Sequence, residues 1–167
     1  MSNIFDKIEI PKKLKVEFQT VELILDSNAQ TKGLDALLLS WAKYEKQHRK
    51  LFEFLVYQSP AITCSNWKEF QLVWVGNKHL YPKHFRCAIK QLTNTRIKTL
   101  VGTRYVELQT SLDQIEKYRN KLLHGQLTGE GLGSSNLLQS TKDVIDWVSL
   151  LADGSETAFS YDGLDRR

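Results

Sequence analysis

The chain has little cysteine and little proline, and it contains no long apolar run. Its two cysteines, Cys64 and Cys87, have no spacing typical of metal ligands and are too few for a disulfide framework. The three prolines, Pro11, Pro60 and Pro82, stand where elements are expected to begin or end. No segment is apolar over the length needed to span a membrane, and the first residues lack the regions of a signal peptide. We therefore expect a cytoplasmic protein with reduced thiols, no metal and no other cofactor.

What the sequence has in abundance is leucine at helical spacing. A chain of 167 residues fits a single domain with a sizeable core. The periodicity predicts an all-α fold, an antiparallel helical bundle of about five or six helices. We expect an N-terminal arm over residues 1–11 and a flexible, polar tail over about 153–167.

Individual helices follow from the apolar spacing and from its interruptions. The predicted ranges are 11–26, 34–58, 82–92, 103–124 and 136–151. In the first of these, the predicted apolar face consists of Val16, Leu23 and Ile24. Residues 65–75 are compatible with a short helix or a strand, and the pattern does not decide between them. Gly76 and Asn77 predict a turn, and the glycines of 129–133 predict a flexible loop.

The helix predicted over 103–124 carries the residues best suited to chemistry. At about 100° per residue, Leu112, Ile115 and Leu122 fall on one stripe, and Arg119 lies inside that stripe. A guanidinium on an apolar face needs a partner, because an unpaired buried charge is very costly. One interpretation is purely structural, with Arg119 paired to Glu116 one turn earlier.

The same helix ends with a histidine followed by a glycine. Asn120 and His124 are four residues apart and are therefore neighbours on the helix surface. A histidine in the last turn and a left-handed glycine cap, here Gly125, are also an ordinary way to end a helix. The spacing alone does not separate this interpretation from a catalytic one.

Residues 119–124, which read Arg-Asn-Lys-Leu-Leu-His, resemble the R-x4-H signature of HEPN domains. The resemblance implies a small helical bundle with this motif at the end of a long helix. It further implies a metal-independent endoribonuclease, a toxin or phage-defence enzyme that acts as a homodimer with the motifs facing across a two-fold axis. One branch of the family has a tyrosine two residues after the histidine, and Gln126 stands there instead. Silencing by nucleotide transfer to that tyrosine is therefore not expected.

Chemistry gives each motif residue a role in RNA cleavage. His124 is the predicted general acid or base, because histidine titrates near neutral pH. Arg119 is the predicted phosphate clamp, since its planar fork matches phosphate oxygens. Asn120 would orient His124 or bind phosphate. Lys121 and Arg104 are the predicted RNA contacts.

Two ionisable residues fall inside the apolar stripe of the 34–58 helix. Glu45 is interpreted first as a paired core carboxylate, and alternatively as a residue that orients Arg119 or His124. His48 is interpreted as a structural histidine, because no cluster of histidine, aspartate and cysteine supports a metal.

Between Glu69 and Glu107 the sequence has no acidic residue. One interpretation is a surface that follows an RNA backbone. The other is a solvated face balanced by acids elsewhere. The interval contains seven cations and two histidines: Lys78, Lys83, Arg86, Lys90, Arg96, Lys98 and Arg104, with His79 and His84.

The competing functional class is a non-catalytic HEPN-like module. Such a bundle would bind RNA or protein as an antitoxin or adaptor and would not cut its ligand. The enzyme hypothesis predicts RNA, a second copy of the chain and a cognate antitoxin as partners. The sequence retains both motif residues, which favours the enzyme.

Overall fold

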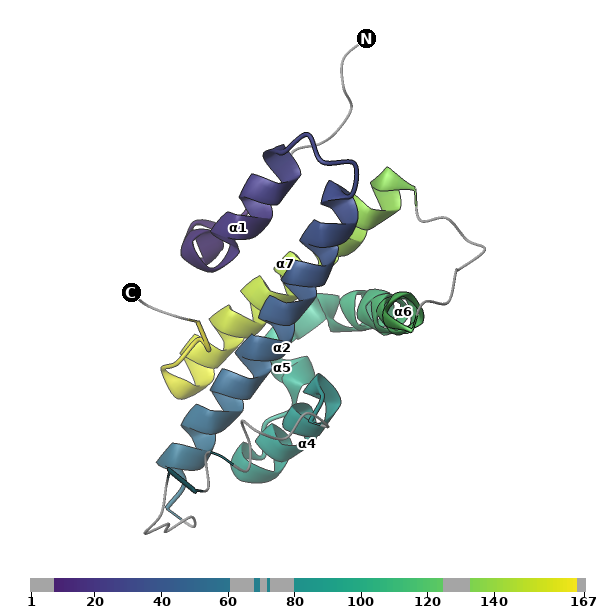
Figure 1. Cartoon of the computed structure of the whole chain (residues 1–167). Coiled ribbons are helices and arrows are strands. Elements are labelled where there is room, and N and C mark those ends of the chain that lie inside the picture. The colour runs from purple at the N-terminus through teal and green to yellow at the C-terminus, as the bar shows by residue number, and fades with distance from the viewer. Residues whose placement is uncertain (1–7, 61–67, 70–71, 73–79, 125–132, 165–167) are drawn as a thin grey trace. The chain divides into compact units, whose positions relative to one another are not determined.

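All secondary structure in the described part of the chain is helical. The computed structural model describes residues 8–60, 68–69, 72, 80–124 and 133–164 of the 167. The prediction of an all-α fold with about five or six helices is confirmed. Its elements (Figure 1) are η1 (Lys12–Leu14), α1 (Lys15–Asp26), α2 (Lys32–Gln58), α4 (Pro82–Thr93), α5 (Ile97–Val101), η2 (Gly102–Arg104), α6 (Tyr105–Leu123) and α7 (Ser134–Phe159).

Local chemistry sets several of the helix boundaries. Pro82 opens α4 after Tyr81, which is extended with φ −101° and ψ 164°. Asn94 ends the same helix in the left-handed region, with φ 57°, where asparagine is tolerated. The predicted break after this helix is therefore confirmed.

The sequence predicted one domain, and the chain divides into two compact units. The first contains Met1–Tyr44 and Thr103–Ser149, and the second contains Glu45–Gly102 and Leu150–Arg166. Helices α2 and α7 each contribute residues to both units.

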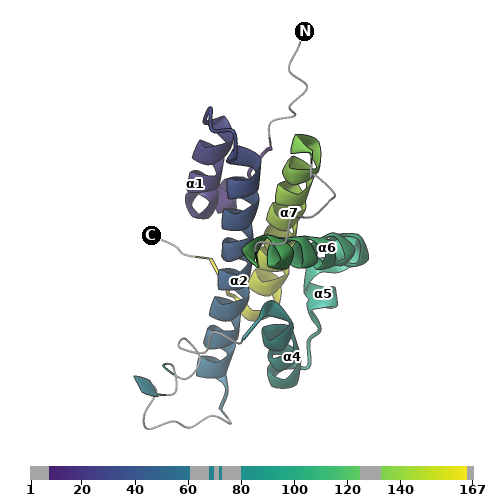
Figure 2. The same cartoon turned by 45° about the vertical axis from the view of Figure 1, so that its right-hand side comes forward.

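Within the first unit, the helices differ in direction. Helix α1 and the start of α2 run antiparallel, as predicted (Figure 1). Gly33 lies against Leu137 near the start of α7, and Tyr44 meets Trp147 further along both helices, so α2 and α7 run the same way. Helix α6 crosses these helices steeply (Figure 2).

A chain of aromatic rings forms the core of the first unit. The centroids of Trp41 and Tyr44 are 4.9 Å apart, and Tyr44 meets Trp147 edge-on at 6.2 Å. The ring of Tyr105, at the start of α6, lies 5.5 Å from that of Trp147. Each of the three rings on α2 and α7 is at most 3% exposed. Large aromatic side chains contribute most of the apolar area that such a core removes from water.

The predicted apolar face of the first helix was wrong. The buried residues of η1 and α1 are Leu14, Phe18 and Val21, whereas Val16 and Leu23 are 61% and 64% exposed. Two apolar faces compete on this helix, and the one with the bulky Phe18 is the one that packs. The predicted arm also ends early, because Ile10 is buried.

The predicted tail was also wrong. Helix α7 continues to Phe159 and not to Leu151, and Ser155 and Leu164 are buried in the second unit. The chain then turns at Gly163, whose backbone lies against Gln47, and the amide of Gln47 donates to the Asp162 carbonyl oxygen at 3.2 Å. Tertiary packing therefore holds a segment whose composition is polar.

Some predictions lie outside the described residues. They are most of the segment 65–75, the turn at Gly76 and Asn77, the cap at Gly125 and the glycine loop of 129–132.

Gly154 provides a test of the packing between α7 and α5. A β-carbon at this position would lie 2.7 Å from Leu100 Cα and closer still to the Leu100 carbonyl oxygen, so backbone and not a flexible side chain would have to move. We expect Gly154→Ala to lower the free energy of unfolding by about 1–3 kcal/mol, the usual cost of overpacking. Denaturant unfolding measures this loss.

The matched control is Gly33→Ala on α2. A β-carbon there would meet only Leu137 side-chain atoms at 3.4 Å, an ordinary contact. Because alanine favours helix, this variant should keep or raise stability. Equal stability of the two variants would contradict the close approach of α7 and α5.

Candidate active site at the end of helix α6

Arg119 lies on the packed side of α6, as its sequence position predicted. Its stripe neighbours Leu112 and Ile115 are 1% and 4% exposed, while Arg119 itself is half-buried. The guanidinium carbon lies 6.0 Å from the centroid of the Trp41 ring on α2. A guanidinium over an aromatic face is attracted by the ring quadrupole, and the ring also restricts its movement. The core therefore accommodates this charge at its edge.

Trp41 belongs to the apolar stripe of the helix predicted over 34–58. Its position in the apolar stripe of α2 gave no sign that it would support Arg119, because the contact joins residues far apart in the sequence. In the structure, Arg119 continues the aromatic chain of Trp41, Tyr44 and Trp147. Whether Arg119 also pairs with Glu116 stays a prediction.

Asn120 connects the arginine to the histidine. An Nη1 group of Arg119 donates to Asn120 Oδ1 at 3.5 Å, the long limit for such a bond. The backbone N–H of His124 donates to the Asn120 carbonyl oxygen at 3.1 Å, which closes the last helical turn. One residue thus contacts Arg119 through its side chain and His124 through its backbone.

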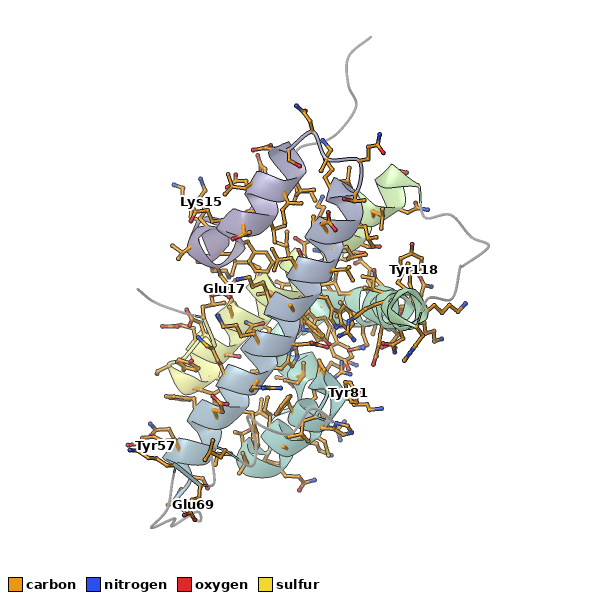
Figure 3. All side chains as sticks on the ribbon, in the orientation of Figure 1. Lys15, Glu17, Tyr57, Glu69, Tyr81 and Tyr118 are labelled. Atoms are coloured by element: carbon orange, nitrogen blue, oxygen red, sulfur yellow. The ribbon has the colours of Figure 1, made fainter. Side chains whose placement is uncertain are left out.

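His124 caps α6 with φ −92° and ψ 11°, and its side chain is exposed. Five residues at helical spacing place it about 140° around the helix from Arg119. Asn120 and Lys121 are exposed as well. Tyr118, directly before Arg119, points away from the α6 ribbon (Figure 3). The site therefore combines one cation held against the core with an imidazole that is open to solvent.

Arg104 has carboxylate partners that the sequence did not indicate. Its Nη1 group donates to Asp146 Oδ2 on α7 at 2.7 Å, and its Nη2 group donates to Glu107 Oε1 at 3.1 Å. The hydrogen bond from Arg104 is the main cause that lowers the pKa of Glu107. The hydrogen bonds to Glu107 and then to Asp146 raise the pKa of Arg104. Two carboxylates therefore neutralise a cation that was predicted to contact RNA.

The two ionisable residues of the α2 stripe belong to the second unit. His48 is fully buried, as its structural interpretation predicted. Glu45 is half-buried, and its role in orienting Arg119 or His124 stays a prediction.

No group of three or more histidine, cysteine, aspartate or glutamate side chains in the described part of the chain is arranged to hold a metal ion. In the same residues, no helix has the length and apolar character needed to cross a membrane. No protein-family model matches the chain, and no curated protein or solved structure is significantly similar to it. The resemblance therefore rests on residues 119–124.

Replacing Arg104 tests whether its charge serves the fold. We expect Arg104→Gln to lower the free energy of unfolding by no more than about 1 kcal/mol, because the side chain is 41% exposed and solvent screens the pair. Since the folded pKa of Glu107 is lowered, the interaction is complete above the usual carboxylate pKa. It is lost as the pH falls through the lowered value, so the gap between wild type and variant should shrink in acid.

Urea unfolding at neutral and acidic pH measures this gap, with the exposed Lys98→Gln as control. If Arg104→Gln instead loses RNA affinity without losing stability, the result would support the prediction that Arg104 contacts RNA.

Proposed function

We propose that the protein is a metal-independent endoribonuclease of the toxin or phage-defence type. The observation that carries this proposal is the arrangement of Arg119, Asn120 and His124 at the end of α6. Arg119 is oriented by Trp41 and Asn120, and His124 is exposed one helical turn beyond Asn120. An oriented guanidinium and an accessible imidazole at the same helix end provide a phosphate clamp and a proton carrier.

The proposed reaction uses the 2′-hydroxyl of RNA as the nucleophile. A base removes the hydroxyl proton, and the oxygen attacks the adjacent phosphorus. The bond to the 5′-oxygen breaks, and an acid protonates that oxygen as it leaves. Arg119 stabilises the charge on the phosphorane oxygens, because a planar guanidinium can donate to two of these oxygens at once.

The reaction needs a base and an acid, and the motif supplies one histidine. We propose a homodimer in which His124 of one protomer is the base and His124 of the partner subunit is the acid. The side of α6 that carries His124 is exposed at Val106, Thr110 and Lys117, which leaves it available to a second copy. Asn120 holds the backbone of His124 by accepting its N–H. Lys121 is exposed beside the motif and is a proposed RNA contact.

The alternative is a helical module that binds RNA or protein without cutting it. The contact between Arg119 and Trp41 favours this alternative, because it gives the arginine a structural role that needs no catalysis. The two proposals differ in a single measurement, the cleavage of RNA by the purified protein.

Alanine substitutions at the motif test the catalytic proposal. We expect His124→Ala to lower the cleavage rate by about 10²- to 10⁴-fold, the usual contribution of general acid–base catalysis. His124→Ala should leave the fold intact, because the side chain is exposed. Arg119→Ala should also abolish cleavage, and its melting temperature should fall because the contact with Trp41 is lost.

The control for both variants is Lys142→Ala, an exposed cation on α7 that belongs neither to the motif nor to the α6 surface proposed for the second copy. It should cut at the wild-type rate. Folding is checked by circular dichroism and thermal melting. The catalytic proposal fails if His124→Ala is folded and still degrades RNA.

The products and the pH profile test the chemistry. A single 2′-deoxy nucleotide at the cleavage point should block cutting, because it removes the nucleophile. The 5′ fragment should end in a 2′,3′-cyclic phosphate, and the 3′ fragment should begin with a free 5′-hydroxyl. Excess chelator should leave the cleavage rate unchanged. If two histidines share the work, the rate should pass through a maximum as the pH is varied. The cleavage rate should also fall more steeply than the protein concentration when the protein is diluted, because the dimer dissociates.

Fragments with a 5′-phosphate, or a strict need for magnesium, would exclude this mechanism. Binding of RNA without any cleavage would instead support the non-catalytic module.

A further inference from the structure

One side of α4 carries only positive charge. Lys83, Arg86 and Lys90 are spaced three and four residues apart, so they fall within about 60° of one another around the helix. Lys83 and Lys90 are exposed, and Arg86 is half-buried. Helix α4 contains no aspartate or glutamate. We call these three residues the α4 basic stripe.

The buried residues of α4 fix the orientation of the helix. Phe85 and Ile89 are 3% and 0% exposed, and the Phe85 ring lies 5.5 Å from that of Phe52 on α2. Lys83 and Lys90 lie about 100° or more around the helix from both buried residues and face outward, whereas Arg86 lies about 60° from Ile89 and is half-buried. Two further exposed cations, Arg96 and Lys98, follow in the same unit.

One of the acids that might have balanced this charge is paired with another cation. Asp143 accepts hydrogen bonds from Ser111 and Gln139, and Asp146 pairs with Arg104, all within the first unit. Asp143 keeps its charge, because both of its donors are neutral, so the interpretation of the basic interval as a balanced, solvated face loses one carboxylate, Asp146.

An exposed aromatic residue stands at the start of the stripe. Tyr81 is 40% exposed and precedes α4 (Figure 3). The Lys83 ammonium lies 5.9 Å from the centroid of its ring, and the His84 ring lies at the same distance. The backbone N–H of Tyr81 donates to His84 Nδ1 at 3.0 Å. In neutral His84 the ring hydrogen is therefore on Nε2, which leaves a donor on this exposed side chain.

We infer that the α4 basic stripe, together with Tyr81 and His84, binds single-stranded RNA. The helical rise separates the exposed Lys83 and Lys90 by about 10.5 Å along the axis, so the two ammonium groups can contact different phosphates of one strand, with Arg86 between them. Tyr81 offers a face on which a base can stack, and the combination of cations with an exposed ring is typical of single-strand binding. An acidic protein would use the cations but would have no comparable use for the ring. The choice of RNA rests on the proposed function, whereas the surface itself does not.

The test uses the full chain with His124→Ala, so that the RNA is not consumed. Affinity for a short, labelled single-stranded RNA is measured by fluorescence anisotropy over a range of salt concentrations. The stripe variant is Lys83→Gln, Arg86→Gln and Lys90→Gln together. The matched control is Lys12→Gln, Lys15→Gln and Lys142→Gln, which removes the same charge from exposed positions in the first unit.

We expect the stripe variant to lose roughly 10- to 100-fold in affinity at low salt and its salt slope to fall by about one to two units, since each phosphate contributes about 0.7. The control should lose less than about threefold. Tyr81→Ala keeps the backbone bond to His84 and should weaken binding at an unchanged slope, because stacking releases no counterions. Circular dichroism verifies that each variant is folded.

Equal losses in the two triple variants would overturn the inference, because only net charge would then matter. Wild-type affinity in the stripe variant would overturn it as well, as would an acidic polypeptide that displaces RNA and binds as tightly. The inference and the proposed function fail separately. Cleavage is measured separately in chains that retain His124. If the wild-type chain never cuts RNA but the stripe variant loses affinity, the surface is supported and the nuclease is rejected. If the stripe variant with His124 binds and cuts like the wild type, only the surface is rejected.

Discussion

The contact between the Arg119 guanidinium and the Trp41 ring is the constraint on which the rest of the first unit depends. Arg119 occupies the side of α6 that packs, where a charge without a partner would be very costly. Trp41 meets Tyr44, Tyr44 meets Trp147, and Trp147 meets Tyr105, which is again on α6. The arginine and these rings therefore form a continuous series of contacts that connects the end of α6, at Arg119, to its beginning, at Tyr105. Such a series fixes α6 across α2 and α7 at two separated points.

The two motif residues thus differ in how much freedom the fold allows them. Arg119 is held by a ring and by Asn120, whereas His124 ends the helix with its side chain in solvent. A phosphate clamp benefits from being oriented before its ligand arrives, since less conformational entropy is then lost on binding. A proton carrier must instead reach both water and substrate. The proposed roles agree with this difference.

The sequence predicted what depends on local spacing. Helical periodicity located α2, α4 and α6, and it placed Arg119 within a packed stripe. The same periodicity could not choose between two apolar faces on α1, because that choice depends on which face meets the core. The sequence also did not predict the burial of Ser155 or the pairing of Arg104 with Asp146, because each depends on residues brought together from distant parts of the chain. The support of Arg119 by Trp41 is of the same kind.

Gly154 has a consequence for how relatives of this protein can be found. Helix α7 touches the backbone of α5 there so closely that only a hydrogen atom fits in place of a side chain. A distant homologue can exchange the core residues for others of similar volume, because cores tolerate repacking. It cannot exchange this glycine without moving two helices apart. A glycine at this place in the last helix is therefore expected in any homologue that keeps the approach of α7 to α5.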